Sequence, residues 1–162
     1  MVQPMSDAPV SFVTVQREIR VPRAQVFGIA SLVGRAAEWL WAPAQAGSPT
    51  SVREMPDGSR RLVVRDGDKL RDWVRETEAP ERVVLDSKYE PRRADVRGRH
   101  LRYELVLEAG VGVTLAKLSV AFHDQPAPTR AVDQRKWRRH AEHCLGRLAD
   151  MALPDVPEDD EG

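Results

Sequence analysis

Hydrophobic and polar residues alternate in the first patterned part of the chain, between Ser11 and Pro22. One side of an extended chain would carry the apolar residues and the other side the polar ones: Val13, Val15, Ile19 and Val21 against Thr14, Gln16, Glu18 and Arg20. A period of two is typical of a strand with one buried face. Arg17 is the exception, because it falls among the apolar positions.

The pattern then changes to a helical spacing in two short segments. Pro22 suits a first helical turn, and apolar residues in 22–31 and again in 34–42 recur as on one side of a helix. Gly34 separates the two segments. We therefore expect two short helices after the first strand.

Alternation returns over the middle of the chain, interrupted by turn residues such as "PDGS", "DGD" and "EAPE". The expected strands lie around residues 50–55, 60–66, 70–78, 82–90, and in two longer segments within 99–123. In the segment 82–90, one face would hold Val83, Leu85, Ser87 and Tyr89, and solvent would meet Asp86, Lys88 and Glu90. Short connections between successive strands predict an antiparallel meander.

A long helix is expected at the end, from about residue 129 to 153. Its apolar residues recur at the three-and-four spacing of one buried face: Trp137, Ala141, Cys144, Leu145, Leu148 and Ala152. No other helix of similar length is predicted, so this helix must lie against the sheet. The expected fold class is α+β with a helix-grip fold, in which a curved antiparallel sheet of about six to seven strands wraps around the long C-terminal helix.

Length and composition fit one domain. The chain has 162 residues, of which 41% are hydrophobic, and we place the domain at 12–153, with a flexible N-terminal tail at 1–11 and an acidic disordered tail at 154–162. The 25 basic and 25 acidic residues cancel, which argues against a nucleic-acid partner. A single cysteine excludes an intramolecular disulfide, and neither a membrane span nor a signal peptide is predicted. We expect a cytoplasmic protein, a monomer or homodimer, without a cofactor.

Three stretches resemble the SRPBCC (START/Bet v 1-like) superfamily, and in particular its polyketide cyclase/dehydratases. They are "VTVQREIRVPRAQVFGIAS", "AEWLWAP" and "WVRETEAPERVVLDSKYE", within a resemblance that covers residues 12–152. These stretches encode packing and turns, so they identify a fold better than a reaction. The resemblance implies an elongated cavity between the sheet and the last helix that binds an apolar molecule of the polyketide, lipid or quinone class.

Polar residues on otherwise apolar faces are the candidates for contact with such a molecule. The predicted catalytic residues are Arg17, Tyr89 and Tyr103, because a guanidinium and a hydroxyl can stabilise the negative charge of an enolate. Each also has a purely structural interpretation, as an ion pair at the sheet edge or as a hydrogen-bonded core tyrosine.

Six further residues are predicted to contact the ligand: Trp39, Trp41, Asp66, Trp73, Ser87 and Trp137. The tryptophans can stack on a flat ligand or fill the core, and Asp66 can be a base or a turn residue. His140 and His143 lie three residues apart on the last helix, but no third ligand accompanies them. We therefore expect both histidines to face solvent and predict no metal.

Three functions remain open at this point. The first is a polyketide cyclase/dehydratase that folds a carbonyl-bearing chain and stabilises its enolate. The second is a non-catalytic carrier or sensor for a lipid or quinone, which needs the cavity but no base. The third is a co-chaperone-like interaction module whose interior is packed shut.

Overall fold

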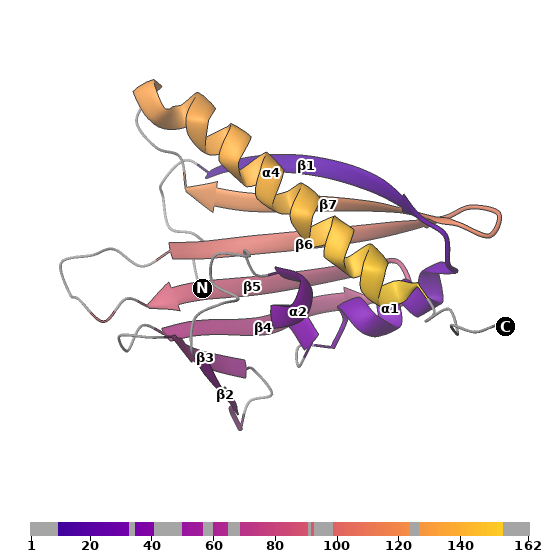
Figure 1. Ribbon diagram of the computed structural model, residues 1–162, viewed down its shortest axis with the longest axis horizontal. Helices are drawn as coiled ribbons and strands as arrows, with labels where there is room; N and C mark the ends of the chain where they lie inside the picture. Colours follow the sequence, from indigo (N-terminus) through magenta and orange to yellow (C-terminus); the bar gives the residue numbers. More distant parts are fainter. Residues whose placement is uncertain are drawn as a thin grey trace, which may run out of the picture.

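The structure is a computed structural model that describes residues 10–32, 35–40, 50–56, 60–64, 69–90, 92, 99–123 and 127–153. A seven-stranded antiparallel sheet forms one layer, with the strand order β1-β7-β6-β5-β4-β3-β2. The helices α1, α2 and α4 form a second layer over one face of this sheet, and α4 crosses it diagonally (Figure 1). This arrangement confirms the predicted helix-grip fold.

The strands and helices follow the alternating and helical segments of the sequence closely. Their bounds are β1 Val10–Ile19, α1 Arg23–Ala30, α2 Ala36–Leu40, β2 Thr50–Glu54, β3 Arg60–Val64, β4 Lys69–Glu78, β5 Arg82–Glu90, β6 Arg99–Ala109, β7 Thr114–His123 and α4 Ala127–Ala152. The seven strands agree with the predicted number. Among the described residues, none of the helices has the length and apolarity needed to cross a membrane.

The strand register divides the sheet into two faces. Val13, Val120, Tyr103 and Leu85 lie side by side across β1, β7, β6 and β5, and all four are buried. We call the face that carries this row, toward α4, the inner face. Because successive side chains of a strand point to opposite sides, the row that contains Asp86 belongs to the opposite, outer face.

The core lies between α4 and the inner face. The helix packs mainly on β1 and also contacts β7, α1 and α2. Its buried residues are those of the predicted stripe, with the addition of Ala149: Trp137, Ala141, Cys144, Leu145, Leu148, Ala149 and Ala152. Full burial of one leucine side chain stabilises the fold by roughly 1.5–3 kcal/mol, so this stripe holds α4 firmly on the sheet.

Candidate functional site

A short polar cluster lies between α4 and the inner face. The hydroxyl of Tyr103 on β6 lies 2.9 Å from Nε2 of His140 on α4, and Sγ of Cys144 lies 3.6 Å from the same nitrogen. Tyr103 is 2% exposed and Cys144 is fully buried, whereas His140 is only half-buried. His140 is therefore the member of the cluster that a molecule from outside can reach.

Burial keeps this cluster uncharged. The pKa of His140 is lowered to about 4, first by burial and then by the positive charges of Arg147, His143 and Lys136. Burial also raises the pKa of the Cys144 thiol to about 12, although Arg147 acts in the opposite direction. At neutral pH the imidazole is thus neutral, with one nitrogen that donates a hydrogen bond and one that accepts.

Aromatic rings surround the imidazole. Trp137, one turn earlier on α4, meets the ring of His140 edge-on at a centroid distance of 5.5 Å, and Tyr103 lies at 6.0 Å. Trp137 also stacks on Phe122 of β7 at 5.7 Å. These rings fix the position of His140 and exclude water from the side that faces the core.

Burial of the inner face decreases from one side of the sheet to the other. The inward residues of β7 are at most 3% exposed. On β4 and at the start of β6, Leu70, Val74 and Leu101 pack on the same core but are only partly buried. Tyr103 follows Leu101 on the inner face of β6 and contacts His140. We call Leu70, Val74, Leu101 and His140 the inner-face rim. An apolar molecule would bury further surface at this rim.

Ser87 and Asp72 face each other on β5 and β4, beside the rim. Ser87 is 7% exposed and Asp72 is 1% exposed. Ser87 was among the predicted ligand contacts, whereas Asp72 was not. The signal was present, because Asp72 lies between Leu70 and Val74 at the period of two that marks inward positions. The inner face therefore carries a carboxylate, which is a strong hydrogen-bond acceptor.

Arg17 does not join Tyr103. Its side chain is exposed, and its Nη1 lies 4.0 Å from the position that a Cβ on Gly146 of α4 would take. In the sheet register Arg17 lies opposite Ala116, which lies opposite Leu107, two rows from Tyr103. The expected meeting of a guanidinium and a tyrosine at one site is therefore not found for this pair.

Three other candidates fall outside the structural description. Trp41 and Asp66 are not among the described residues, and for Tyr89 only the backbone is described, in register with Leu70 and Arg99. Their proposed roles stay predictions.

The remaining tryptophans occupy different places. Trp39 is fully buried, and its Nε1 has no hydrogen-bond acceptor among the described residues, so Trp39 is a core residue and does not lie at an opening. Trp137 is 9% exposed and packs on Phe122. Trp73 lies in register with Asp86 on the outer face. This corrects the expectation that Trp73 lines the space beneath α4.

The prediction that both histidines of α4 face solvent was wrong for His140 and correct for His143, which is exposed. The spacing contained the information, because Trp137, His140 and Cys144 recur at intervals of three and four, as residues on one face of a helix do. Within the described part of the chain, no group of three or more histidine, cysteine or acidic residues is arranged to hold a metal ion.

Comparison with known proteins identifies the fold. No family model matches the sequence, and no curated protein matches it. Among solved structures, Ara h 8.0201 is similar with a TM-score of 0.61 at 14% identity, covering 91% of this chain and all of the other. Protein CV1439 from Chromobacterium violaceum also has a TM-score of 0.61, at 16% identity, with 89% and 98% of the two chains covered.

DynU16, from the dynemicin biosynthetic locus, is similar with a TM-score of 0.53 at 19% identity. The match covers 86% of this chain, which spans a little under half, 46%, of DynU16. At these identities the similarity concerns the fold alone. The chain has the Bet v 1-like helix-grip fold that its sequence stretches predicted.

Proposed function

We propose that this protein binds a hydrophobic, carbonyl-bearing small molecule between α4 and the inner face of the sheet, and that it acts as a polyketide cyclase/dehydratase. The observation that carries the proposal is the hydrogen-bonding contact of Tyr103 with His140, 2.9 Å, next to apolar inner-face residues that are only partly buried. The sequence resemblance to polyketide cyclase/dehydratases and the fold shared with a protein of a biosynthetic locus support it.

His140 is the residue that contacts the ligand in this proposal, and Tyr103 positions it. If the tyrosine hydroxyl donates to Nε2, the imidazole proton lies on Nδ1, which can donate to a carbonyl oxygen. Such a donor stabilises the negative charge that develops on that oxygen when a proton leaves the neighbouring carbon. The proton passes to a water molecule at the half-buried rim, and the enolate carbon attacks a second carbonyl of the same chain. The alkoxide that forms takes a proton back from water, and loss of water followed by enolisation completes the aromatic ring.

Orientation supplies much of the rate in this scheme. An apolar wall of Leu70, Val74 and Leu101 would hold the chain folded, so that the two carbonyl groups meet without a search. Ser87 and Asp72 are placed to receive ligand hydroxyl groups on the same face. Arg17 has no role in this proposal, because it is exposed two rows away.

Native mass spectrometry with a panel of aromatic polyketides, quinones and fatty acids tests the binding. A one-to-one complex is expected, and His140→Ala should weaken it about tenfold, as the loss of one hydrogen bond to a ligand implies. His143→Ala is the matched control, since His143 is an exposed histidine on the same helix. Binding to no member of the panel would contradict the proposal.

Turnover separates an enzyme from a carrier. A linear poly-β-ketone analogue should lose one water in the presence of the protein, and Tyr103→Phe should slow this step because it releases the imidazole that Tyr103 holds. Binding without loss of water would assign the protein to the carriers.

A second candidate function rests on the tight packing beneath α4. Leu118, Val120, Cys144 and Leu145 are at most 1% exposed, which leaves no room for a ligand next to them. This packing favours a protein-interaction module with a closed interior. If no ligand of the panel binds, that function would be favoured over both the cyclase and the carrier.

A further inference from the structure

The outer face of the sheet carries two charged clusters of opposite sign. The described helices all lie over the other face, and none of them covers this one (Figure 1). The basic cluster consists of Arg71, Arg75, Lys88 and Arg102, arranged around Asp86 and Trp73. The acidic cluster consists of Glu76, Glu78, Glu104 and Glu108, with Arg82 and Lys117 among them.

The basic cluster is held together by one buried carboxylate. Oδ1 of Asp86 accepts a hydrogen bond from Nε of Arg102 at 3.0 Å, and Oδ2 accepts one from Nη1 of Arg75 at 3.4 Å. Asp86 was predicted to face solvent, yet it is 0% exposed because these basic side chains cover it. The guanidinium of Arg71 lies over the ring of Trp73, 5.3 Å from its centre. Among the described residues, four basic side chains lie near one carboxylate, so this part of the face is positive.

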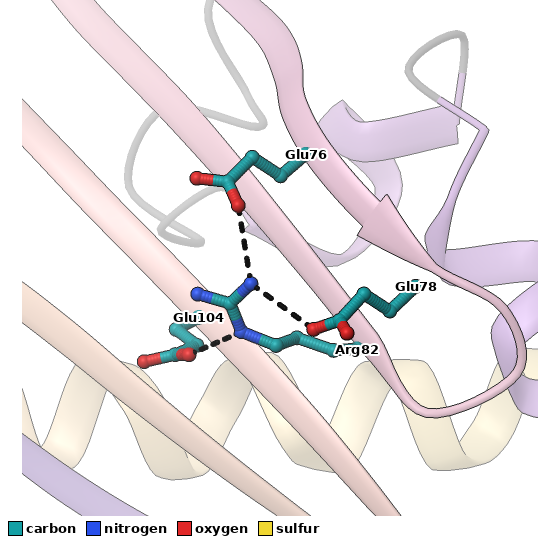
Figure 2. Close-up of polar contacts among 4 residues, drawn as sticks. All are labelled: Glu76, Glu78, Arg82 and Glu104. Carbon is teal, nitrogen blue, oxygen red and sulfur yellow. Dashed lines mark hydrogen bonds and ion pairs between the residues drawn. The ribbon is translucent and has the colours of Figure 1, made fainter.

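The acidic cluster is organised in the opposite sense, around one arginine. Arg82 contacts Glu104 at 2.6 Å, Glu76 at 3.2 Å and Glu78 at 3.4 Å, as Figure 2 shows. Lys117 contacts Glu108 at 2.8 Å. Four carboxylates share two cations, so this cluster is negative.

The strand register places the two clusters end to end along the strands. Arg102 and Glu104 are neighbouring outer residues of β6, and on β4 Arg71 precedes Glu78 with Trp73 and Glu76 between them. The arginines of the basic cluster and the four glutamates of the acidic cluster are already held by contacts within the chain, so binding would cost less conformational entropy. Phe12, which lies in the row of Arg102 and is 65% exposed, adds apolar surface.

We propose that the outer face binds a second copy of the same chain through a two-fold contact. The two-fold axis lies in the plane of the interface, perpendicular to the strands, and passes between the two clusters. Rotation about this axis places each strand of one copy over the same strand of the other copy, and the two run in opposite directions. Arg102 then meets Glu104 of the second copy, and Arg71 meets Glu78 of the second copy. Lys88 lies opposite Arg82 of the second copy, whose charge is already compensated by its three glutamate partners. Each contact occurs twice, because a two-fold interface is self-complementary.

A strongly anionic partner such as nucleic acid fits this face less well. It would be attracted by the basic cluster but repelled by the acidic cluster beside it on the same sheet. The chain as a whole has a formal net charge of zero, so no general field attracts a polyanion. A partner that matches both clusters must carry an acidic and a basic cluster at the same spacing. A second copy of this chain carries both.

Charge reversal in two separate variants tests this interface by sedimentation velocity. The first variant, Arg71→Glu, places a carboxylate opposite Glu78 of the second copy. The second, Glu78→Lys, places an ammonium group opposite Arg71 of the second copy. Both substituted residues lie in the outer clusters, away from the Tyr103–His140 pair, so ligand binding by each variant should be unchanged. The wild type is expected to dimerise at about 50 mM salt and to dissociate at about 500 mM.

Each variant alone should have a dissociation constant raised at least about tenfold, since attraction becomes repulsion at two symmetric contacts. An equimolar mixture of the two variants should restore the dimer as a heterodimer, which also shows that both variants fold. A wild type that stays monomeric at low salt would overturn the proposal, as would a mixture that stays monomeric. If the wild-type protein stays monomeric but binds a single-stranded DNA oligonucleotide, and the first variant does not bind it, the partner of the outer face would be a polyanion and not a second copy.

Discussion

Acid is expected to destabilise this protein through His140 before it protonates most carboxylates. The imidazole lies beside the Tyr103 hydroxyl and the Cys144 thiol, and its pKa is lowered to about 4 in the folded chain. In the unfolded chain it returns to an ordinary pKa of about 6.5. Between these two values the unfolded state binds a proton that the folded state does not, so the free energy of unfolding falls as the pH falls.

The size of the effect follows from the two pKa values. Stability is fully present above the unfolded pKa, about 2 kcal/mol is lost by about pH 5, and the loss reaches about 3 kcal/mol below about pH 4. Since a domain of ordinary size has a stability of about 5–15 kcal/mol, one residue would account for a substantial part of its sensitivity to acid.

Urea unfolding at several pH values between about 7.5 and about 5 measures this contribution. The variant His140→Gln keeps a group that can hydrogen-bond with Tyr103 but does not titrate, so its stability should fall by about 2 kcal/mol less than that of the wild type over this range. His143→Gln removes an exposed histidine from the same helix and should behave like the wild type. The imidazole signal of His140 in NMR spectra should titrate near pH 4 in the folded protein.

Two results would contradict this effect of His140. One is a pH dependence of His140→Gln equal to that of the wild type, which would mean that the imidazole does not release its proton on folding. The other is titration of His140 near its ordinary value, which would place the ring in water and remove the basis for its proposed contact with a ligand.

Three further predictions concern the buried residues. Asp86→Asn should lower the free energy of unfolding by about 1–3 kcal/mol, because the buried site loses the charge that pairs with the partly exposed Arg75 and Arg102, whereas Glu104→Gln at a more exposed ion pair should cost less than about 1 kcal/mol in the same urea experiment. Leu145→Ala should cost about 2–5 kcal/mol by creating a cavity beneath α4, and exposed Leu153→Ala less than about 0.5 kcal/mol. The Cys144 thiol should not react with a disulfide reagent near neutral pH until the protein is unfolded; rapid labelling of the native chain would contradict its burial.

The backbone of this fold could be predicted from the sequence because its signals are periodic and redundant. In β1 three apolar residues, Val13, Val15 and Ile19, mark the same face, and in α4 the stripe from Trp137 to Ala152 continues over several turns. One misread residue does not change such a pattern. The order of strands, two short helices, meander and long helix therefore follows from hydrophobic spacing and turn residues.

The polar residues were harder to place because their burial depends on partners from other strands. Asp86 was correctly assigned to the outer face, but its burial comes from Arg75 and Arg102, which lie 11 and 16 residues away in sequence. His140 was assigned to solvent, although its hydrogen-bond partner Tyr103 lies 37 residues away on β6. The sequence shows which residues are polar, but it does not show which distant residue will form the hydrogen bond or ion pair that allows a polar residue to be buried.

Register also decides which polar residues belong to one site. Trp73 and Asp72 are neighbours in sequence but lie on opposite faces of β4, and only Asp72 shares the inner face with Ser87. A bulge between Val74 and Glu76 then shifts the alternation along the same strand. The inner-face rim and the charged outer face are thus built from the same few strands. A substitution at one β4 position should affect ligand binding or self-association but not both, which allows the two proposals to be tested independently.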